Sequence, residues 1–222
     1  PLTRLRNRAS DALATAGTAD DLRDALEYVI QESDDLIKVF NALLMIARME
    51  AGHASENMTF FDASTVVADV AELYEALAED EGVQLAVQME PNLNVFGNKE
   101  LLGQAVSNIL DNALKYGRSD RPGNRRSVIS VSARHNANYV VIEVADSGKG
   151  IPDKDKERVF KRFTRLEASR TKPGFGLGLS LVAAVANLYG GHVKLDDNRP
   201  GLIVRLIIPM MTRKVGKVSE VS

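Results

Sequence analysis

The first fifty residues carry a hydrophobic pattern with the period of a helix. No proline interrupts residues 18–52, and Thr18, Asp20 and Asp21 suit a helix N-terminus, both as caps and as negative charges near the positive end of the helix dipole. Alternate steps of four and three residues give eight positions, seven of them apolar, in the pattern of a coiled-coil seam: Leu22, Leu26, Val29, Ser33, Leu36, Phe40, Leu43 and Ala47. We therefore predict a long helix with one apolar edge.

A shorter helix over residues 2–14 precedes the long one across the turn TAGT. Two helices bury little surface by themselves, so we predict an antiparallel hairpin that pairs with a second copy of the chain into a four-helix bundle. The alternative is that the hairpin packs on the rest of the chain.

After Gly52 the pattern alternates between the helical and the strand period. It predicts helices at 63–78, 99–116 and 177–189, and strands at 83–88, 94–95, 128–134, 139–145, 192–195 and 202–208. Helices on one side of a mixed sheet make an α+β sandwich of ordinary domain size. We expect three parts: a truncated helical hairpin at 1–55, an α+β domain at 56–210 and a flexible tail at 211–222.

Composition narrows the class of protein. The 222 residues are 45 % hydrophobic and 26 % charged, as in a soluble globular chain, and no apolar stretch approaches the length that crosses a bilayer. A net charge of -2 excludes a whole-chain basic field for nucleic acid. The absence of cysteine excludes disulfides and thiolate sites and fits a reducing compartment such as the cytoplasm. Because the chain starts at Pro1, we expect it to be part of a longer protein.

The block NILDNALKYG, from Asn108 to Gly117, places two amides on one helical face. Asn108 and Asn112 are four residues apart, about one helical turn. A hard cation such as Mg²⁺ takes oxygen ligands and also binds the phosphates of a nucleotide. Lys115, on the next turn, offers a positive charge to the same phosphates. The alternative is an amide pair hydrogen-bonded to backbone in an ordinary core.

The block DSGKGIP begins with Asp146 at the end of a strand that reads as buried, so its carboxylate needs a hydrogen-bond donor. The exocyclic amino group of adenine is such a donor. Gly148 and Gly150 lack the Cβ atoms that would keep a flat base away from the backbone. The alternative is a capped β-turn, because this sequence is also ordinary turn chemistry.

The block GFGLGLSL runs directly into an apolar helix, whose N-terminus would offer unpaired N–H groups to phosphates. Ahead of it, the basic stretch 161–172 reads as a mobile lid, with Phe160 and Phe163 expected to anchor its start in the core. A solvated run of charges is the alternative.

Together these blocks, with VFKRFTR at Val159, resemble the N, G1, F and G2 boxes of sensor histidine kinases, on the Bergerat ATP-binding fold of the GHKL superfamily. The resemblance runs from about residue 60 to residue 208, and the hairpin resembles the dimerisation and histidine phosphotransfer domain of that family. It implies ATP and Mg²⁺ as ligands, with Asn112 as the metal ligand and Asn108 beside it. The nucleotide-binding residues that it implies are Asn108, Asn112, Lys115, Tyr116, Asp146, Gly148, Gly150, Ile151, Phe160, Arg162, Gly174, Gly176, Leu177, Gly178 and Leu179.

The sequence departs from the family pattern at two places. The family's phosphorylated histidine lies in a motif like H-E-L-R-T-P-L, and this chain opens with the tail of that motif, PLTRLRN. We therefore expect the accepting histidine before Pro1, since His53, His135 and His192 do not replace it. Phe175 stands where the G2 box commonly has a small polar residue, which puts one hydrogen bond to phosphate in doubt.

The resemblance implies a protein histidine kinase core of a two-component system. It would transfer the γ-phosphoryl group of ATP to a histidine upstream and then to an aspartate of a response regulator. No catalytic residue is assigned within the chain, although Arg162 is a candidate lid cation. The alternatives are a GHKL ATPase, which has a glutamate where Asn108 stands, and a pseudokinase or nucleotide-dependent signalling scaffold.

The expected partners are a second copy of the chain and the receiver domain of a response regulator, with no nucleic acid. No membrane contact is expected within this segment. We expect the kinase core in the cytoplasm, with the parent protein either soluble or anchored in the inner membrane.

Overall fold

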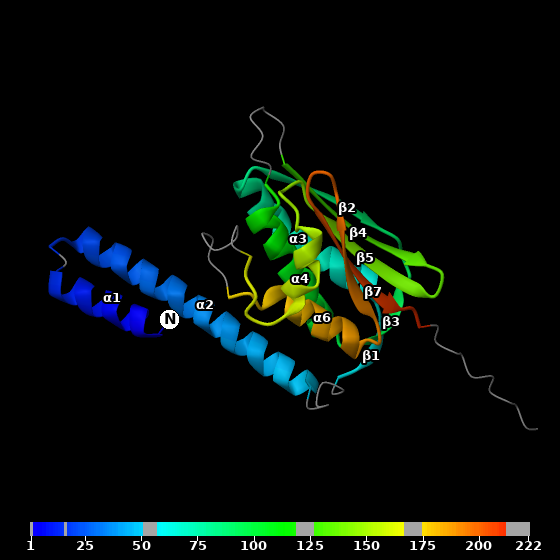
Figure 1. Cartoon of the computed structure of the whole chain (residues 1–222), viewed down its shortest axis with the longest axis horizontal. Coiled ribbons are helices and arrows are strands. Elements are labelled where there is room, and N and C mark those ends of the chain that lie inside the picture. The colour runs from blue at the N-terminus through cyan, green and yellow to red at the C-terminus, as the bar shows by residue number, and fades with distance from the viewer. Residues whose placement is uncertain (1, 16, 51–56, 119–126, 167–174, 212–222) are drawn as a thin grey trace, which may run out of the picture. The chain divides into compact units, whose positions relative to one another are not determined.

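The computed structural model describes residues 2–15, 17–50, 57–118, 127–166 and 175–211. The chain divides into two compact units, residues 1–47 and 48–222 (Figure 1). The division falls near the end of the long helix, and the three-part domain organisation expected from the sequence stays a prediction. No helix within the described ranges is both long and apolar enough to cross a membrane, and the expected localisation also stays a prediction.

The first unit is the predicted helical hairpin, with α1 at Leu2–Thr15 and α2 at Ala19–Glu50. A reciprocal cap starts α2. Thr18 Oγ1 accepts from the Asp21 N–H (3.1 Å), and Asp21 Oδ2 accepts from the Thr18 N–H (3.1 Å). These bonds satisfy donors that the first helical turn leaves open, so α2 begins where the sequence indicates.

An apolar stripe on α2 lies open to solvent. Ile37 is 57 % exposed and Phe40 is 62 % exposed. The exposed apolar residues that follow one another at steps of three, four and seven are Leu26, Ile30, Ile37, Phe40 and Leu44. The stripe shares Leu26 and Phe40 with the predicted seam. At three other seam positions, Val29, Leu36 and Leu43, the side chain is half-buried, and the exposed residue is the next one along the chain.

The second unit is built on a five-stranded sheet of strand order β2-β4-β5-β7-β6. The β2–β4 pair is parallel, whereas the other three pairs are antiparallel. The predicted mixed sheet is therefore confirmed. The strands are β2 at Val83–Met89, β4 at Ser127–Asn136, β5 at Tyr139–Ala145, β6 at His192–Asp197 and β7 at Leu202–Pro209.

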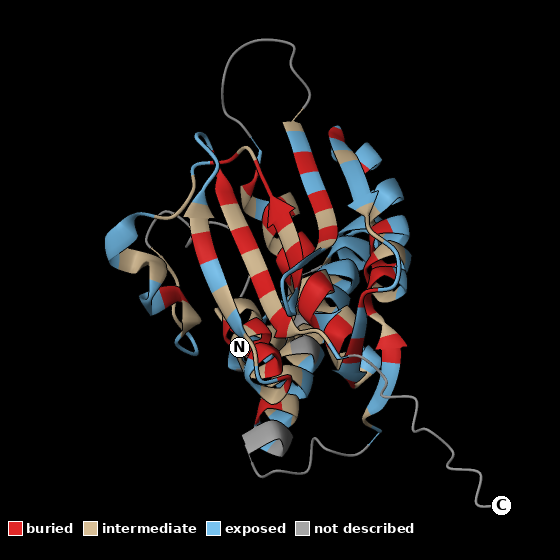
Figure 2. Cartoon of the chain, turned by 90° about the vertical axis from the view of Figure 1, so that its right-hand side faces the viewer, coloured by how far each residue is buried: buried red, intermediate tan, exposed pale blue. Residues whose placement is uncertain are grey.

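Three helices cover one face of this sheet (Figures 1 and 2). They are α3 at Ala63–Asp80, α4 at Lys99–Tyr116 and α6 at Gly178–Leu188. Helix α4 belongs to the crossover that allows β2 and β4 to run parallel. The alternation of β7 explains the layering, because every second side chain faces the helices and is buried: Leu202, Val204, Leu206 and Ile208.

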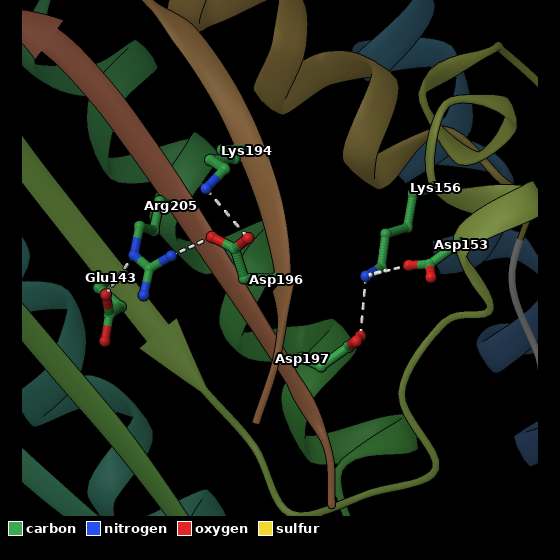
Figure 3. Close-up of polar contacts among 7 residues, drawn as sticks. All are labelled: Glu143, Asp153, Lys156, Lys194, Asp196, Asp197 and Arg205. Carbon is green, nitrogen blue, oxygen red and sulfur yellow. Dashed lines mark hydrogen bonds and ion pairs between the residues drawn. The ribbon is translucent and has the colours of Figure 1, made fainter. Parts of the chain in front are cut away.

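The opposite face of the sheet carries ion pairs across its strands (Figure 3). Arg205 on β7 donates from Nε to Glu143 Oε2 on β5 (2.6 Å) and also bonds Asp196 on β6. Lys194 Nζ lies 3.0 Å from the second oxygen of Asp196. Cross-strand pairs of opposite charge stabilise neighbouring strands, so this network supports the antiparallel half of the sheet.

Short elements complete the fold, and of these the sequence predicts only a strand at 94–95. Strand β1 at Thr59–Asp62 pairs with β3 at Asn94–Gly97 in a separate two-stranded sheet, and α5 at Asp153–Lys156 and η2 at Arg158–Phe160 follow β5. Segments of three or four residues contain too few positions to establish a period. The aromatic pair in β1 was the available signal for that strand.

Asp62 joins the small sheet to α3. Its carboxylate caps α3 by accepting from the Ser64 N–H (3.0 Å) and hydroxyl (2.7 Å), and it accepts from the backbone N–H groups of Asn92 (3.0 Å) and Leu93 (2.9 Å). Burial raises the pKa of Asp62, but these hydrogen bonds outweigh burial and hold the pKa below its ordinary value. The ionised form is therefore the one that the fold stabilises.

We expect Asp62→Ala to lower the free energy of unfolding by about 2–3 kcal/mol at neutral pH, because it removes a helix cap and charge-assisted hydrogen bonds. Urea denaturation of the variant measures this loss. The stabilisation is complete above the ordinary carboxyl pKa and disappears as the pH falls through the lower folded pKa, so the difference should close below about pH 4.

Asp69→Ala is the matched control, since Asp69 is exposed on the same helix and its side chain makes no hydrogen bond to the described residues. It should change the free energy of unfolding by less than about 0.5 kcal/mol. Equal losses in the two variants would contradict the conclusion that Asp62 connects the small sheet to α3.

Candidate functional site

Helix α4 directs both asparagine amides toward the start of α6. A Cβ atom on Gly178 would lie 3.2 Å from Asn108 Oδ1 and 3.3 Å from Asn112 Nδ2. Asn108 Nδ2 donates to the carbonyl oxygen of Gln104, one turn earlier on α4 (2.8 Å). The bond fixes this amide with its oxygen toward Gly178. The structure thus brings together Asn108, Asn112 and Gly178, which the sequence places in two separate blocks.

Asp146 lies at the end of the central strand β5 and is 7 % exposed. Its Oδ1 accepts from the backbone N–H groups of Gly148 (2.8 Å) and Leu202 (3.2 Å). Burial raises the pKa of the Asp146 carboxyl, and the two N–H bonds offset part of the rise. The hydrogen-bond donors that we expected for the Asp146 carboxylate are therefore backbone N–H groups. Both bond Oδ1, and no described residue donates to Oδ2.

The loop after β5 packs tightly on the end of α4. A Cβ on Gly148 would lie 2.1 Å from the carbonyl oxygen of Tyr116, and one on Gly117 would lie 2.5 Å from Asp146 Cβ. The Ser147 N–H also donates to the Gly117 carbonyl (3.3 Å). Only glycine permits such approaches. They bring the last turn of α4, which carries Lys115 and Tyr116, next to Asp146.

The β6–β7 turn holds Asp146 from the other side, which the sequence analysis missed. Asn198 Nδ2 donates to the backbone carbonyl of Asp146 (2.7 Å), and a Cβ on Gly201 would lie 1.8 Å from that same oxygen. The dipeptide Pro200-Gly201 marks a turn in the sequence, but nothing in the sequence says which strand end the turn contacts.

Helix α6 begins without a side-chain cap. Its N-cap residue, Leu177, is buried and makes no side-chain hydrogen bond, and its carbonyl accepts from the Ser180 hydroxyl (2.8 Å). Gly176 has φ +71°, and a Cβ there would lie 2.5 Å from the Thr164 carbonyl. The glycine thus lets the chain turn into α6, whose first N–H groups form a positive helix end next to Asn112.

The segment between the two glycine-rich blocks is described up to residue 166. Val159 is buried in η2, which packs on α6, whereas Phe160 is half-buried and Phe163 is 59 % exposed with φ +60°. The expectation that Phe163 anchors the segment in the core is therefore wrong. Its left-handed backbone conformation follows the turn that ends η2, and Val159 supplies the buried contact instead.

The remaining candidates lie around this arrangement. Ile151 and Leu179 are half-buried, Gly150 has φ +69° and lies against the carbonyl of Gly201, and Arg162 is exposed. Gly174 lies outside the described residues, as do the lid residues 167–172 and His53. No group of three or more His, Asp or Glu side chains arranged to hold a metal ion occurs in the part of the chain that the structure describes.

Residues 97–212 match the family described as histidine kinase-, DNA gyrase B- and HSP90-like ATPases. The match covers just over half of the 222 residues and includes α4, the loop after β5 and α6, which form the candidate site. The chain belongs to this family. Membership confirms an ATP-binding domain of the GHKL type and the predicted α+β fold.

Curated relatives of this ATPase-family chain are sensor kinases. IrlS of Burkholderia pseudomallei, a sensor protein, is 32 % identical over 199 residues, which are 89 % of this chain and 41 % of IrlS. SenX3 of Mycobacterium tuberculosis, a sensor-like histidine kinase, is 30 % identical over 203 residues, which are 90 % of this chain and 48 % of SenX3. The chain spans less than half the length of these relatives, and the predicted resemblance to sensor histidine kinases is confirmed.

The solved structure of the histidine kinase AdeS from Acinetobacter baumannii has the same fold. It superposes with a TM-score of 0.74 at 18 % identity and covers 96 % of each chain. The likeness extends over the helical hairpin as well as the ATP-binding unit, because so little of either chain is left out.

Proposed function

We propose that this chain is the catalytic core of a sensor histidine kinase. It binds ATP with Mg²⁺ in its second unit and transfers the γ-phosphoryl group to a histidine that precedes Pro1 in the full-length protein. An aspartate of a response regulator then receives the group. The observation that carries the proposal is that two glycine-rich segments meet helix α4: Gly178 lies against Asn112, and Asp146 lies against Gly117 at the end of the same helix.

Asp146 is suited to read adenine. Its Oδ1 is held by two backbone N–H groups, which leaves Oδ2 as an acceptor for the exocyclic amino group of the base. Gly148 and Gly150 do not make room for the base, contrary to the expectation from the sequence, because a Cβ on Gly148 would lie against the Tyr116 carbonyl and one on Gly150 against the Gly201 carbonyl. Both glycines instead pack the loop that carries Asp146 against neighbouring backbone. A carboxylate in this environment distinguishes adenine, which offers a donor, from guanine, which has a carbonyl at the equivalent position.

The phosphates would lie between α4 and the start of α6. The positive end of α6 and Lys115 suit their charge, and Arg162 stands at the beginning of the lid segment. The amide oxygens of Asn112 and Asn108 fit Mg²⁺, which takes few protein ligands and completes its shell with water and phosphate oxygens. When bound, the ion would neutralise charge on the transferred group.

Asn108 argues against a GHKL ATPase that uses a glutamate as the base at this position. An amide does not accept a proton from water at neutral pH. The Asn108 side chain is moreover bonded to α4 through Nδ2, with its oxygen directed at Gly178. With no base at this position to activate water, the site favours transfer of the phosphoryl group to a protein side chain. In this proposal that acceptor lies outside the second unit.

A second copy of this chain is the partner proposed for the hairpin. The exposed apolar stripe of α2 follows the spacing of a four-helix bundle seam, and a soluble helix seldom exposes such a stripe without a partner. The receiver domain of a response regulator would be the second partner, at the stage when the phosphoryl group leaves the histidine.

We expect Asp146→Asn to weaken the binding of ATP and of ADP together by about 1–3 kcal/mol, because the new amide would face the amino group of adenine with a donor.

Asn112→Ala should weaken ATP binding chiefly when Mg²⁺ is present and leave the metal-free affinity nearly unchanged. Isothermal calorimetry with Mg²⁺ and with a chelator separates the two effects. Equal losses for Asn112→Ala in both conditions would mean that Asn112 supports the helix and does not bind the metal.

Phosphotransfer itself is tested with labelled ATP. The present chain should stay unlabelled, whereas a version extended upstream through the H-E-L-R-T-P-L-like motif should acquire an acid-labile label that a receiver domain removes. Label on His53, His135 or His192 of the present chain would overturn the assignment of the acceptor. An extended chain that binds ATP but never becomes labelled would favour the pseudokinase alternative.

The dimer is tested by placing charge on the apolar stripe. Ile37→Asp and Phe40→Asp would each bury an unpaired carboxylate in the bundle at a cost of several kcal/mol, so each variant should be monomeric. Multi-angle light scattering at micromolar concentration measures the mass. Gln31→Asp, which adds the same charge on another face of α2, should remain dimeric. A monomeric unsubstituted chain would contradict the proposal.

A further inference from the structure

The β6–β7 turn is attached to the end of β5 by main-chain and side-chain hydrogen bonds. The Asp146 N–H donates to the Leu202 carbonyl (2.9 Å), which extends the β5–β7 ladder by one residue beyond Ala145. Asn198 closes the turn, since its N–H donates to the Gly201 carbonyl (3.1 Å). The same residue therefore shapes the turn with its backbone and reaches Asp146 with its side chain.

The ladder between Asp146 and Leu202 departs from the regular pattern. In a regular antiparallel pair of this kind, the two residues exchange two N–H···O bonds, so the Leu202 N–H would donate to the Asp146 carbonyl. It instead donates to the Asp146 side chain, at Oδ1 (3.2 Å). The Asp146 carbonyl accepts from Asn198 Nδ2 (2.7 Å) in its place.

The exchange of donors has a consequence for the carboxylate. Because the Asn198 amide satisfies the Asp146 carbonyl, the Leu202 N–H is available to hold Oδ1. Without that amide, the regular ladder bond would compete for the Leu202 N–H. Oδ1 would then keep only the Gly148 N–H, and the carboxylate would lose one of the two bonds that set its orientation.

The turn is also anchored one residue earlier. Asp197 Oδ1 lies 2.8 Å from Lys156 Nζ, which is held as well by Asp153 (2.7 Å), so α5 fixes the base of the turn (Figure 3). This contact limits how far Asn198 is able to follow a movement of Asp146. A fixed donor sets an orientation more strictly than a mobile one.

We propose that Asn198 is a positioning residue for base recognition: its side-chain amide replaces a ladder donor at the Asp146 carbonyl and so keeps the Asp146 carboxylate directed at the base. This inference rests on the proposed function of Asp146. Asn198 does not touch the nucleotide in this proposal. It acts on selectivity between bases through the orientation of one carboxylate.

The test compares ATP with inosine triphosphate, whose base has a carbonyl in place of the amino group of adenine. Calorimetry on the purified chain should show a preference for ATP. In Asn198→Ala the affinity for ATP should fall and that for inosine triphosphate should not, so the preference falls by about tenfold, the equivalent of one hydrogen bond to a charged group. Asn198→Asp, which keeps the shape of the turn but presents no donor, should behave in the same way.

Asn138→Ala is the matched control, because Asn138 lies in the exposed β4–β5 turn and its side chain makes no hydrogen bond to the described residues. It should keep the full preference. In an Asp146→Asn background, Asn198→Ala should cause no further loss of preference, since the two residues act through one carboxylate.

Two results separate this inference from the function on which it rests. An unsubstituted chain that binds ATP and inosine triphosphate equally would overturn the reading of adenine by Asp146. An unsubstituted chain that prefers ATP, with the preference intact in both Asn198 variants, would overturn only the role of Asn198. Equal weakening of both nucleotides in those variants would likewise overturn it, because it would indicate a structural role.

Discussion

The second unit is organised around one constraint, a carboxylate buried at the end of its central strand. Removing an ionised carboxylate from water is costly unless donors replace the water, and Asp146 finds them in two backbone N–H groups. These groups reach Oδ1 only because the neighbouring chain segments approach closely. The absence of Cβ atoms at Gly117, Gly148 and Gly201 follows from that requirement, since each would clash with atoms around Asp146.

The same crowding links the parts of the nucleotide site. Gly117 and Gly148 join the end of α4 to the loop after β5, and Gly178 joins the start of α6 to the two asparagines of α4. Gly117 and Gly148 have no room for a Cβ atom, and a Cβ on Gly178 would press on the two asparagine amides, so these segments have little freedom to shift. The groups proposed for base, metal and phosphate are therefore held by one packed framework before any ligand binds, which lowers the ordering cost of binding.

Long periodic segments were predictable from the sequence, and contacts between distant segments were not. The pattern gives the bounds of α4 at 99–116 and of β5 at 139–145, because eighteen and seven residues establish a period. The order of the four boxes also singles out Asn112 and Asp146 as candidate residues of one nucleotide site, and that assignment stays a prediction. Strand β1 and helix α5 are too short for a period, and the exposure of Phe163 follows from a backbone turn that propensity does not encode.

Asn198 shows most clearly what a single sequence leaves out. In the sequence it is one polar residue of a turn that begins with two aspartates, and turn chemistry accounts for it fully. Only the register of β5 against β7 brings Asp146 opposite Leu202, and only then does the Asp146 carbonyl require a donor from outside the ladder. The role of Asn198 thus depends on a pairing between segments some fifty residues apart. Asp146, in contrast, could be singled out from its place in the sequence, at the end of a strand that reads as buried. Residues such as Asn198, whose partners are distant in the sequence, are recognised only when the donor of each buried backbone carbonyl in the folded chain is identified.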